Sequence, residues 1–359
     1  ARTDTNLEQG RAPRISMIQE GPWTSLRGLS IHLMSGVTPS EALDFKRSNL
    51  RLLFPALREL SLTQSTTHPT NLHFKDWLPI APRLTSLTLA ISVNHGPGNP
   101  FSSLFDILRV STSLADLKLT TNVMEYRMGV SQEVLRPEVP LPSLQTLDIT
   151  FHNEQSDILR GLVDYLILPS LTSFIFDSDA PCTKLWHELK DKRWDLHEGF
   201  SAPRIGLLAQ LLTSLIKLCR RSECQLEELK INLTSSMLRA SDEDSVSLES
   251  SDAHLAHRLL NDHGQALRVL HLQTAHCTEK LLRFTLDRLP VGIQQVKIGI
   301  RHPSESGLER YIREWFGERQ KAEMKARKKG KGINKLEVVI KAVDVQVNVV
   351  HRDPEFLTL

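Results

Sequence analysis

The chain has 359 residues, of which 40% are hydrophobic, and its 44 basic and 42 acidic side chains give a formal net charge of +2. A charge this balanced gives no overall preference for nucleic acid or for an anionic membrane surface. Four cysteines are too few for a disulfide-stapled secreted scaffold. The sequence has neither an apolar run near the ~18 residues that cross a bilayer nor a secretory signal peptide. We therefore expect a reduced cytoplasmic or nuclear protein that makes no membrane contact.

The predicted elements alternate between strands and helices. Residues 1–20 are polar and lack periodicity, so we expect a linker or a poorly ordered end there. Strands are expected at Trp23–His32, after Pro55, at Leu84–Ile91, at Leu141–Phe151 and at Leu226–Leu233. Apolar periodicity predicts helices at residues 40–50, 71–80, 101–110, 157–167, 207–218, 253–261, 278–289 and 307–325. The tail alternates strictly at Val343, Val345, Val347 and Val349, as an end strand would.

An apolar triplet with a fixed spacing recurs along the chain. Its members stand at positions 1, 4 and 6 of a short segment, as Leu144, Leu147 and Ile149 do. The first members of the triplets are Leu26, Leu57, Leu84, Leu114, Leu144, Leu171, Leu226, Leu267, Ile293 and, in a weaker copy, Ile333. Successive copies are 31, 27, 30, 30, 27, 55, 41, 26 and 40 residues apart. Because 55 is close to twice 27, one copy is either degenerate or replaced by an insertion.

This spacing predicts a particular stacking of strands. The second and third members are two residues apart, so they share one face of a strand, and the residues beside them point to the other face. One strand cannot bury an apolar face alone, so neighbouring copies must stack. The pattern is that of leucine-rich repeats, whose period is typically ~20–29 residues. We predict an α/β leucine-rich-repeat solenoid over residues 21–359, a horseshoe with a curved parallel sheet on its concave face and helices on its convex face.

Three stretches interrupt the rhythm. Residues 178–203 are interpreted as an insertion. Residues 235–252, SSMLRASDEDSVSLESSD, are rich in serine and acidic groups and have little to bury, so we expect a disordered loop. Residues 321–332 form a basic loop. Within it, the run Lys321–Lys331 is compatible with a nuclear-localisation or phosphate-binding patch, although a helix that extends into a solvated loop explains the same charges.

Part of the sequence resembles a known family. The segment LTSLIKLCRRSECQLEELKI at Leu212–Ile231, with LPSL at Leu141–Leu144 and at Leu168–Leu171, resembles the large fungal group of F-box-like proteins with C-terminal leucine-rich repeats. The resemblance covers the repeats, and we find no F-box, the segment that docks on a Skp1-type adaptor in that family. It implies that the repeats hold a protein to be ubiquitinated. A Skp1-type adaptor is expected only if an F-box lies upstream of Ala1.

Candidate catalytic and metal-binding groups are sparse. His187-Glu188 is followed by Asp191 in place of a second histidine, so the zinc pattern H-E-x-x-H is incomplete. His254 and His257 lie one helical turn apart, a spacing that can bind a metal, but we interpret them as part of a solvated helix face because the sequence supplies no Cys or further ligands there.

Cys219 and Cys224 are five positions apart, which is wrong for a zinc knuckle and fits a core thiol at a helix end. The sequence has no nucleophile elbow, phosphate loop or dinucleotide fingerprint. We therefore expect no enzyme activity, cofactor or metal.

The outward face of the predicted sheet is the candidate binding surface. Its first strands carry small neutral residues, and charges of both signs gather from Asp116 to Lys230. The expected contact residues are Asp116, Lys118, Thr120, Asp148, Thr150, Asp177, Glu228, Lys230 and Asn232. Met124, Tyr126 and Met128, which follow the fourth strand, are expected to act as loop anchors, because Tyr and Met are enriched at interface cores.

These observations predict a non-enzymatic protein–protein recognition module. As the family resemblance implies, it would be the substrate-binding part of an F-box-type receptor in an SCF ubiquitin ligase. One alternative is a standalone leucine-rich-repeat scaffold or regulator with no ligase link. An alternative from another class is a nucleic-acid-binding protein that uses the basic run at residues 321–331.

Overall fold

The structure is a computed structural model. It describes residues 23–33, 54–64, 77–93, 102–123, 138–151, 162–178, 207–233, 254–274, 279–290, 293–300, 314–315, 317–318 and 337–342, and also Leu52, Tyr311 and Lys321. The chain divides into two compact units, Ala1–Leu144 and Gln145–Leu359. Each unit contains helices and a parallel sheet, so the predicted α/β class with a parallel sheet is confirmed.

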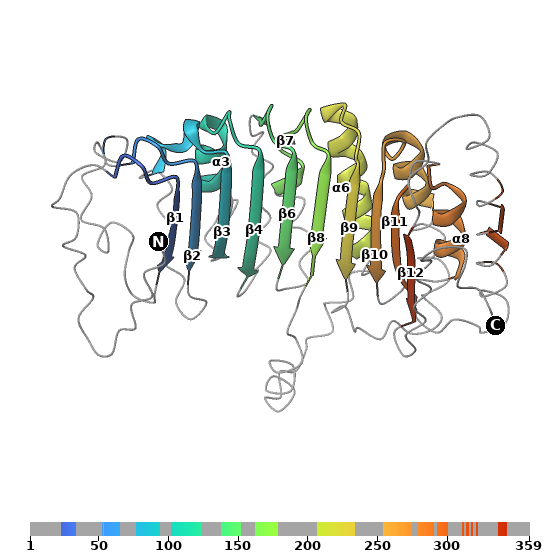
Figure 1. The fold of residues 1–359 in the computed structure, drawn as a ribbon. Helices are drawn as coiled ribbons and strands as arrows, with labels where there is room; N and C mark the ends of the chain where they lie inside the picture. The colour runs from blue at the N-terminus through green and yellow to red at the C-terminus, as the bar shows by residue number, and fades with distance from the viewer. Residues whose placement is uncertain are drawn as a thin grey trace, which may run out of the picture. The chain divides into compact units, whose positions relative to one another are not determined.

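The first unit contains a sheet with the strand order β1-β2-β3-β4 (Figure 1). Its elements are β1 (Gly28–Leu33), β2 (Glu59–Gln64), the 3-10 helix η4 (Ala81–Arg83), β3 (Ser86–Val93), α3 (Ser102–Val110), β4 (Asp116–Val123) and the short β5 (Val139–Pro140). Each strand pairs in parallel with the next one along the chain. The predicted helix over residues 101–110 is therefore confirmed as α3.

The second unit contains a parallel sheet with the strand order β6-β8-β9-β10-β11-β12. Its elements are β6 (Thr146–Phe151), β7 (Leu166–Ile167), β8 (Ser173–Asp177), α6 (Leu207–Ser222), β9 (Glu228–Leu233), β10 (Val269–Thr274), α8 (Glu279–Asp287), β11 (Gln295–Ile300) and β12 (Glu337–Ala342). A further helix spans residues 254–263. The predicted helices over residues 207–218, 253–261 and 278–289 are thus present.

The strands pair so that equivalent members of the apolar triplets lie side by side. Leu60 pairs with Leu87, and Leu87 pairs with Leu117. All three side chains are buried, as are their counterparts Leu147, Phe174, Leu229, Leu270 and Val296 in the second unit. Leu29 on the edge strand β1 is only half-buried, because an edge strand has a neighbour on one side alone. The alternation in the sequence therefore identifies the core side of both sheets.

One hydrogen-bond arrangement recurs where the chain enters its strands. The first member of a triplet donates its backbone N–H to the carbonyl oxygen three residues earlier at Leu26, Leu57, Leu84, Leu114, Leu144, Leu171, Leu267 and Ile293. A second contact joins consecutive copies, in which one carbonyl oxygen accepts two successive N–H groups of the next copy. The carbonyl oxygen of Arg27, for example, accepts from Arg58 and Glu59 at 2.7 and 2.9 Å. Leu226 departs from the first arrangement and donates to His263.

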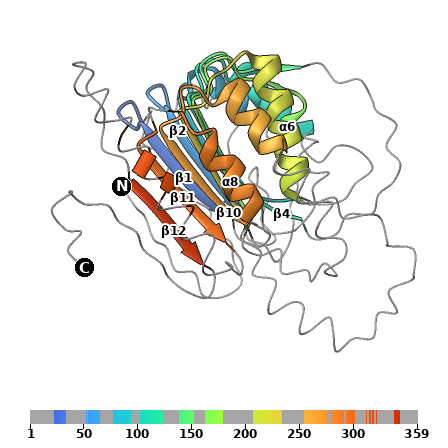
Figure 2. The same ribbon diagram turned by 90° about the vertical axis from the view of Figure 1, so that its right-hand side faces the viewer.

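Helices cover one face of the second sheet. Figure 2 shows α6 and α8 on the same side of the strands. The apolar face of α6 is buried at Leu208, Leu211, Leu212, Leu215 and Leu218, whereas Lys217 and Arg220 are exposed. The buried side chains of the strands face these helices. The residues between them in each strand therefore point to the opposite side of the sheet.

No strand lies between β8 and β9 in the described part of the sheet. Although Leu171 and Leu226 are 55 positions apart, β8 and β9 are direct neighbours, with Ser173 paired to Glu228 and Phe174 to Leu229. A degenerate copy would have placed its own strand between them. Of this interval the structure describes α6 and the residues that lead into β9.

Two helix predictions were wrong in part. The helix expected at residues 157–167 does not reach its predicted end, because Leu166–Ile167 is the strand β7. Pro169 disfavours the helical conformation for Leu168, the residue before it, so the backbone there prefers an extended conformation. In the region 71–80, the described residues form turns and then η4. Pro79 and Pro82 remove two amide donors there and prevent a regular α-helix.

Other predictions lie outside the described residues. These are the polar segment 1–20, the helix at 40–50, the loop 235–252, the tail strand at 343–349 and the insertion beyond Ser178. Of the helix predicted at 307–325, the structure describes Tyr311, Glu314, Trp315, Gly317, Glu318 and Lys321, all helical. In the part of the chain that is described, no helix is both long enough and apolar enough to pass through a membrane.

Candidate protein-binding face

The candidate surface is the side of each sheet that faces away from the buried triplets. We call it the polar face, and it consists of the first, third and fifth residues of the main strands. Parallel register places these residues in rows that run across the strands, at the ~4.8 Å spacing of neighbouring strands. Each row can be followed within one unit from the strand pairing.

In the first unit the polar face carries three of the predicted contact residues. Asp116, Lys118 and Thr120 all lie on β4, with Asp116 and Lys118 exposed and Thr120 half-buried. Their neighbours on β3 are Ser86, Thr88 and Ala90. This part of the surface therefore combines two charges with small side chains, as the sequence predicted.

In the second unit the structure brings the other predicted residues together. Thr150 pairs with Asp177, and Asp177 pairs with Asn232, so these three form one row across β6, β8 and β9. Asp148 pairs with Ile175 one row away. The Oδ1 atom of Asn232 is buried and accepts no hydrogen bond within the described part of the chain.

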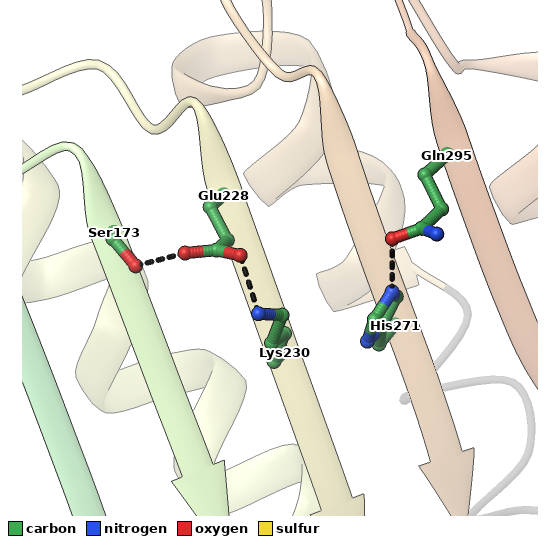
Figure 3. A network of polar contacts seen from close by, with 5 residues as sticks. All are labelled: Ser173, Glu228, Lys230, His271 and Gln295. Carbon is green, nitrogen blue, oxygen red and sulfur yellow. Dashed lines mark hydrogen bonds and ion pairs between the residues drawn. The ribbon is translucent and has the colours of Figure 1, made fainter. Parts of the chain in front are cut away.

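Glu228 is the centre of a small polar network at the start of β9. Its Oε1 atom pairs with the Lys230 ammonium at 2.5 Å, and its Oε2 atom accepts a 2.5 Å hydrogen bond from the Ser173 hydroxyl on β8 (Figure 3). Burial raises the pKa of Glu228, but the hydrogen bonds and charge of Lys230, together with Ser173, outweigh this and hold the pKa below its ordinary value. The carboxylate is thus ionised and a weak base, which positions Ser173 without activating it.

His271 on β10 forms the second contact in this region. Its Nε2 atom lies 2.8 Å from Oε1 of Gln295 on β11, and because an amide oxygen only accepts, Nε2 is the donor. Burial lowers the pKa of His271, and the charges of Lys297 and Lys230 lower it further, against the raising effects of Gln295 and Glu228. The ring is therefore mainly neutral at pH 7.

Sequence reasoning identified Glu228 and Lys230 as site residues but not their surroundings. Ser173 bonds to Glu228, and His271 and Gln295 form a separate contact on the next two strands, although none of these three was a predicted contact residue. The alternation along each strand shows that these three residues point outward. Only the pairing of residues between neighbouring strands shows which residues they contact. The predicted anchors Met124, Tyr126 and Met128 lie outside the described residues.

The cysteines and histidines considered as reactive or metal-binding groups lie away from the polar face, and the structure describes some of them. Cys219 and Cys224 are free and buried at the end of α6, as predicted for core thiols. A hydrogen bond with Cys224 and burial raise the pKa of Cys219, which disfavours the reactive thiolate. His254 is exposed on its helix. Among the described residues, no three His, Cys, Asp or Glu side chains gather where they could hold a metal ion.

The fold and this surface define an α/β protein with a parallel sheet in each unit. In the second unit, helices cover one face of the sheet and the other face carries polar side chains. No protein-family model matches the chain, and no curated protein matches its sequence.

Proposed function

We propose that the chain is a non-enzymatic protein-recognition module built as a leucine-rich-repeat solenoid, and that the polar face holds the partner. The repeat assignment is supported by the recurring N–H to carbonyl contact at the first member of eight triplets. It is also supported by the pairing of equivalent triplet residues on neighbouring strands. Stacked units of this kind present a continuous surface that suits a macromolecule.

The observation that carries the recognition function is the pre-ordered network on the polar face of the second unit. Glu228 is fixed between Ser173 and Lys230, and both members of the ion pair are only 27% and 33% exposed. Groups that are already oriented and partly desolvated lose less entropy and hydration when a partner binds. Charged groups in such a surface select among partners, while adjacent apolar groups contribute affinity.

We further propose that the partner is a protein to be ubiquitinated and that the chain is the substrate-binding part of an SCF-type receptor. The support is the family resemblance carried by Leu212–Ile231 and by the two LPSL segments. Co-purification of the full-length gene product with a Skp1-type adaptor tests this role. If partners are retained but the adaptor does not co-purify, the chain is a standalone scaffold.

A steric block tests the recognition function without assuming the chemistry of the partner. Thr150→Trp and Gln273→Trp each place a large side chain on the polar face, and Lys217→Trp places the same side chain on exposed α6. Partners from affinity capture should be lost with the two face variants and retained with the control. Equal retention by all three variants would refute binding through the polar face.

A further inference from the structure

Three basic side chains form one row on the polar face of the second unit. Strand pairing places Lys230 on β9 beside His271 on β10, and His271 beside Lys297 on β11. Lys297 is exposed, and no ion pair within the described part of the chain involves it. Lys230 uses one contact for Glu228, but an ammonium has three donors. We call Lys230, His271 and Lys297 the basic row.

Half-buried apolar side chains border the basic row. Ile175 on β8 is paired with Lys230, and Val269 on β10 is paired with Glu228. Both side chains are partly exposed, and their paired neighbours Lys230 and Glu228 are polar. A molecule that fits this region would therefore present anionic groups to the row and apolar groups beside it.

We propose that the basic row binds an acidic polypeptide segment, with Asp or Glu carboxylates placed over Lys230 and Lys297 and apolar side chains placed on Ile175 and Val269. This inference rests on the recognition function proposed above and names the chemistry of the partner at that surface. Carboxylates pair with ammonium groups through charge-assisted hydrogen bonds, which are stronger than neutral ones.

The geometry of the row restricts the spacing of the acidic residues. Lys230 and Lys297 are two strands apart, which corresponds to roughly 9.6 Å at the usual ~4.8 Å strand spacing. In a polyproline II segment, residues i and i+3 lie on the same side and are about 9.3 Å apart. A segment with acidic residues at every third position, crossing the strands, would thus match both lysines.

His271, between the two lysines, makes this binding dependent on pH. The groups that face it are Glu228 and Lys230 on β9, Gln295 and Lys297 on β11, and Val269 and Gln273 on its own strand. Burial, and to a lesser degree the neighbouring lysines, lower the pKa of His271 and so disfavour a protonated ring in the free protein. A carboxylate above the row would favour the protonated ring, so the acidic segment should bind more tightly as the pH falls from about 8 to about 6.

The charges around the row favour a polypeptide over a nucleic acid. On β6 to β11, the polar face carries three acidic residues, Asp148, Asp177 and Glu228, against the two lysines of the row. A phosphate backbone carries a charge at every nucleotide and would meet these carboxylates. A polypeptide with acidic residues only at every third position can place its charges over the two lysines alone. None of the described face residues on these strands is a Trp, Tyr or Phe that could stack on a base.

The test uses the full chain and a fluorescein-labelled peptide that repeats Glu-Pro-Ala, followed by fluorescence anisotropy. A Gln-Pro-Ala peptide of equal length and a thymidine oligonucleotide of equal charge are the comparison probes. Lys297→Glu reverses one charge of the row, and Lys217→Glu makes the same change on α6. His271→Gln removes the titrating ring but keeps a polar side chain.

The acidic peptide should bind at least tenfold more tightly than the Gln peptide. Lys297→Glu should weaken its binding about tenfold, which is ~1.4 kcal/mol, and Lys217→Glu should leave it unchanged. His271→Gln should abolish the gain in affinity at lower pH.

Three results would overturn the inference: tighter binding of the oligonucleotide, equal effects of both lysine variants, or no peptide binding up to about 1 mM, where ΔG is only ~−4 kcal/mol. If the peptide fails but captured partners are still lost with Gln273→Trp, the acidic chemistry is wrong and the recognition face stands.

Discussion

Replacing Arg221 with methionine should destabilise the second unit by about 2–4 kcal/mol. The Arg221 guanidinium donates to the carbonyl oxygen of Leu166 at 2.7 and 3.0 Å and to that of Val163 at 2.9 Å. These bonds join the end of α6 to a segment 55 or more residues earlier. Hydrogen bonds to charged groups contribute ~1.5–3 kcal/mol each, so two carbonyls would give about 3–6 kcal/mol at a buried site. We expect a smaller loss of about 2–4 kcal/mol because the arginine is only partly buried.

Urea denaturation of the full chain measures this loss, and Arg220→Met is the matched control because Arg220 is adjacent and exposed. The control should stay within ~0.5 kcal/mol of the wild type. Arg221→Lys should lose most of the same energy, since an ammonium lacks the planar fork that reaches two carbonyls. The amide of Leu168, which donates to Ser222 Oγ at 2.8 Å, should exchange faster in Arg221→Met. Equal stabilities of Arg221→Met and Arg220→Met would refute this reasoning.

Three further predictions concern packing and charge. Gly264→Ala should destabilise the protein by ~1–3 kcal/mol in urea, because its Cβ would lie 2.8 Å from the Leu260 carbonyl oxygen. Phe174→Ala should cost ~3–5 kcal/mol in the same assay because Phe174 is fully buried, whereas Ile175→Ala on the polar face should cost much less. The lowered pKa of Glu228 means that its contribution to stability is present above the ordinary carboxyl pKa and is lost as the pH falls through the lower folded value. Glu228→Gln should therefore be less stable than the wild type in urea at pH 7, and the difference should shrink as the pH falls below the ordinary carboxyl pKa; a constant difference would contradict the assignment.

The buried half of the fold could be predicted from the sequence because it depends on local periodicity. The two-residue spacing of Leu87 and Leu89 places both on one strand face whatever lies beside them, and both are fully buried. The same reasoning predicted which side chains alternate outward, including Glu228 and Lys230. Prediction at this level needs only the geometry of a single strand.

The contacts on the polar face could not be predicted in the same way. The bond between Ser173 and Glu228 joins residues 55 positions apart, so it requires that β8 and β9 be neighbours. The sequence left open whether an additional strand separated them. The strand β7 was missed for a different reason. The apolar residues of 157–167 fit a helical period, and the effect of Pro169 on the residue before it was not weighed against that period.

Photo-crosslinking tests the central claim most directly, namely that a protein partner is held on the polar face. A photoreactive amino acid would replace Gln273, which is exposed on that face, or Lys217, which is exposed on α6. Illumination of the captured complex should join the partner to the chain at position 273 and not at position 217. Cross-linking at position 217 alone, or equally at both positions, would contradict the account.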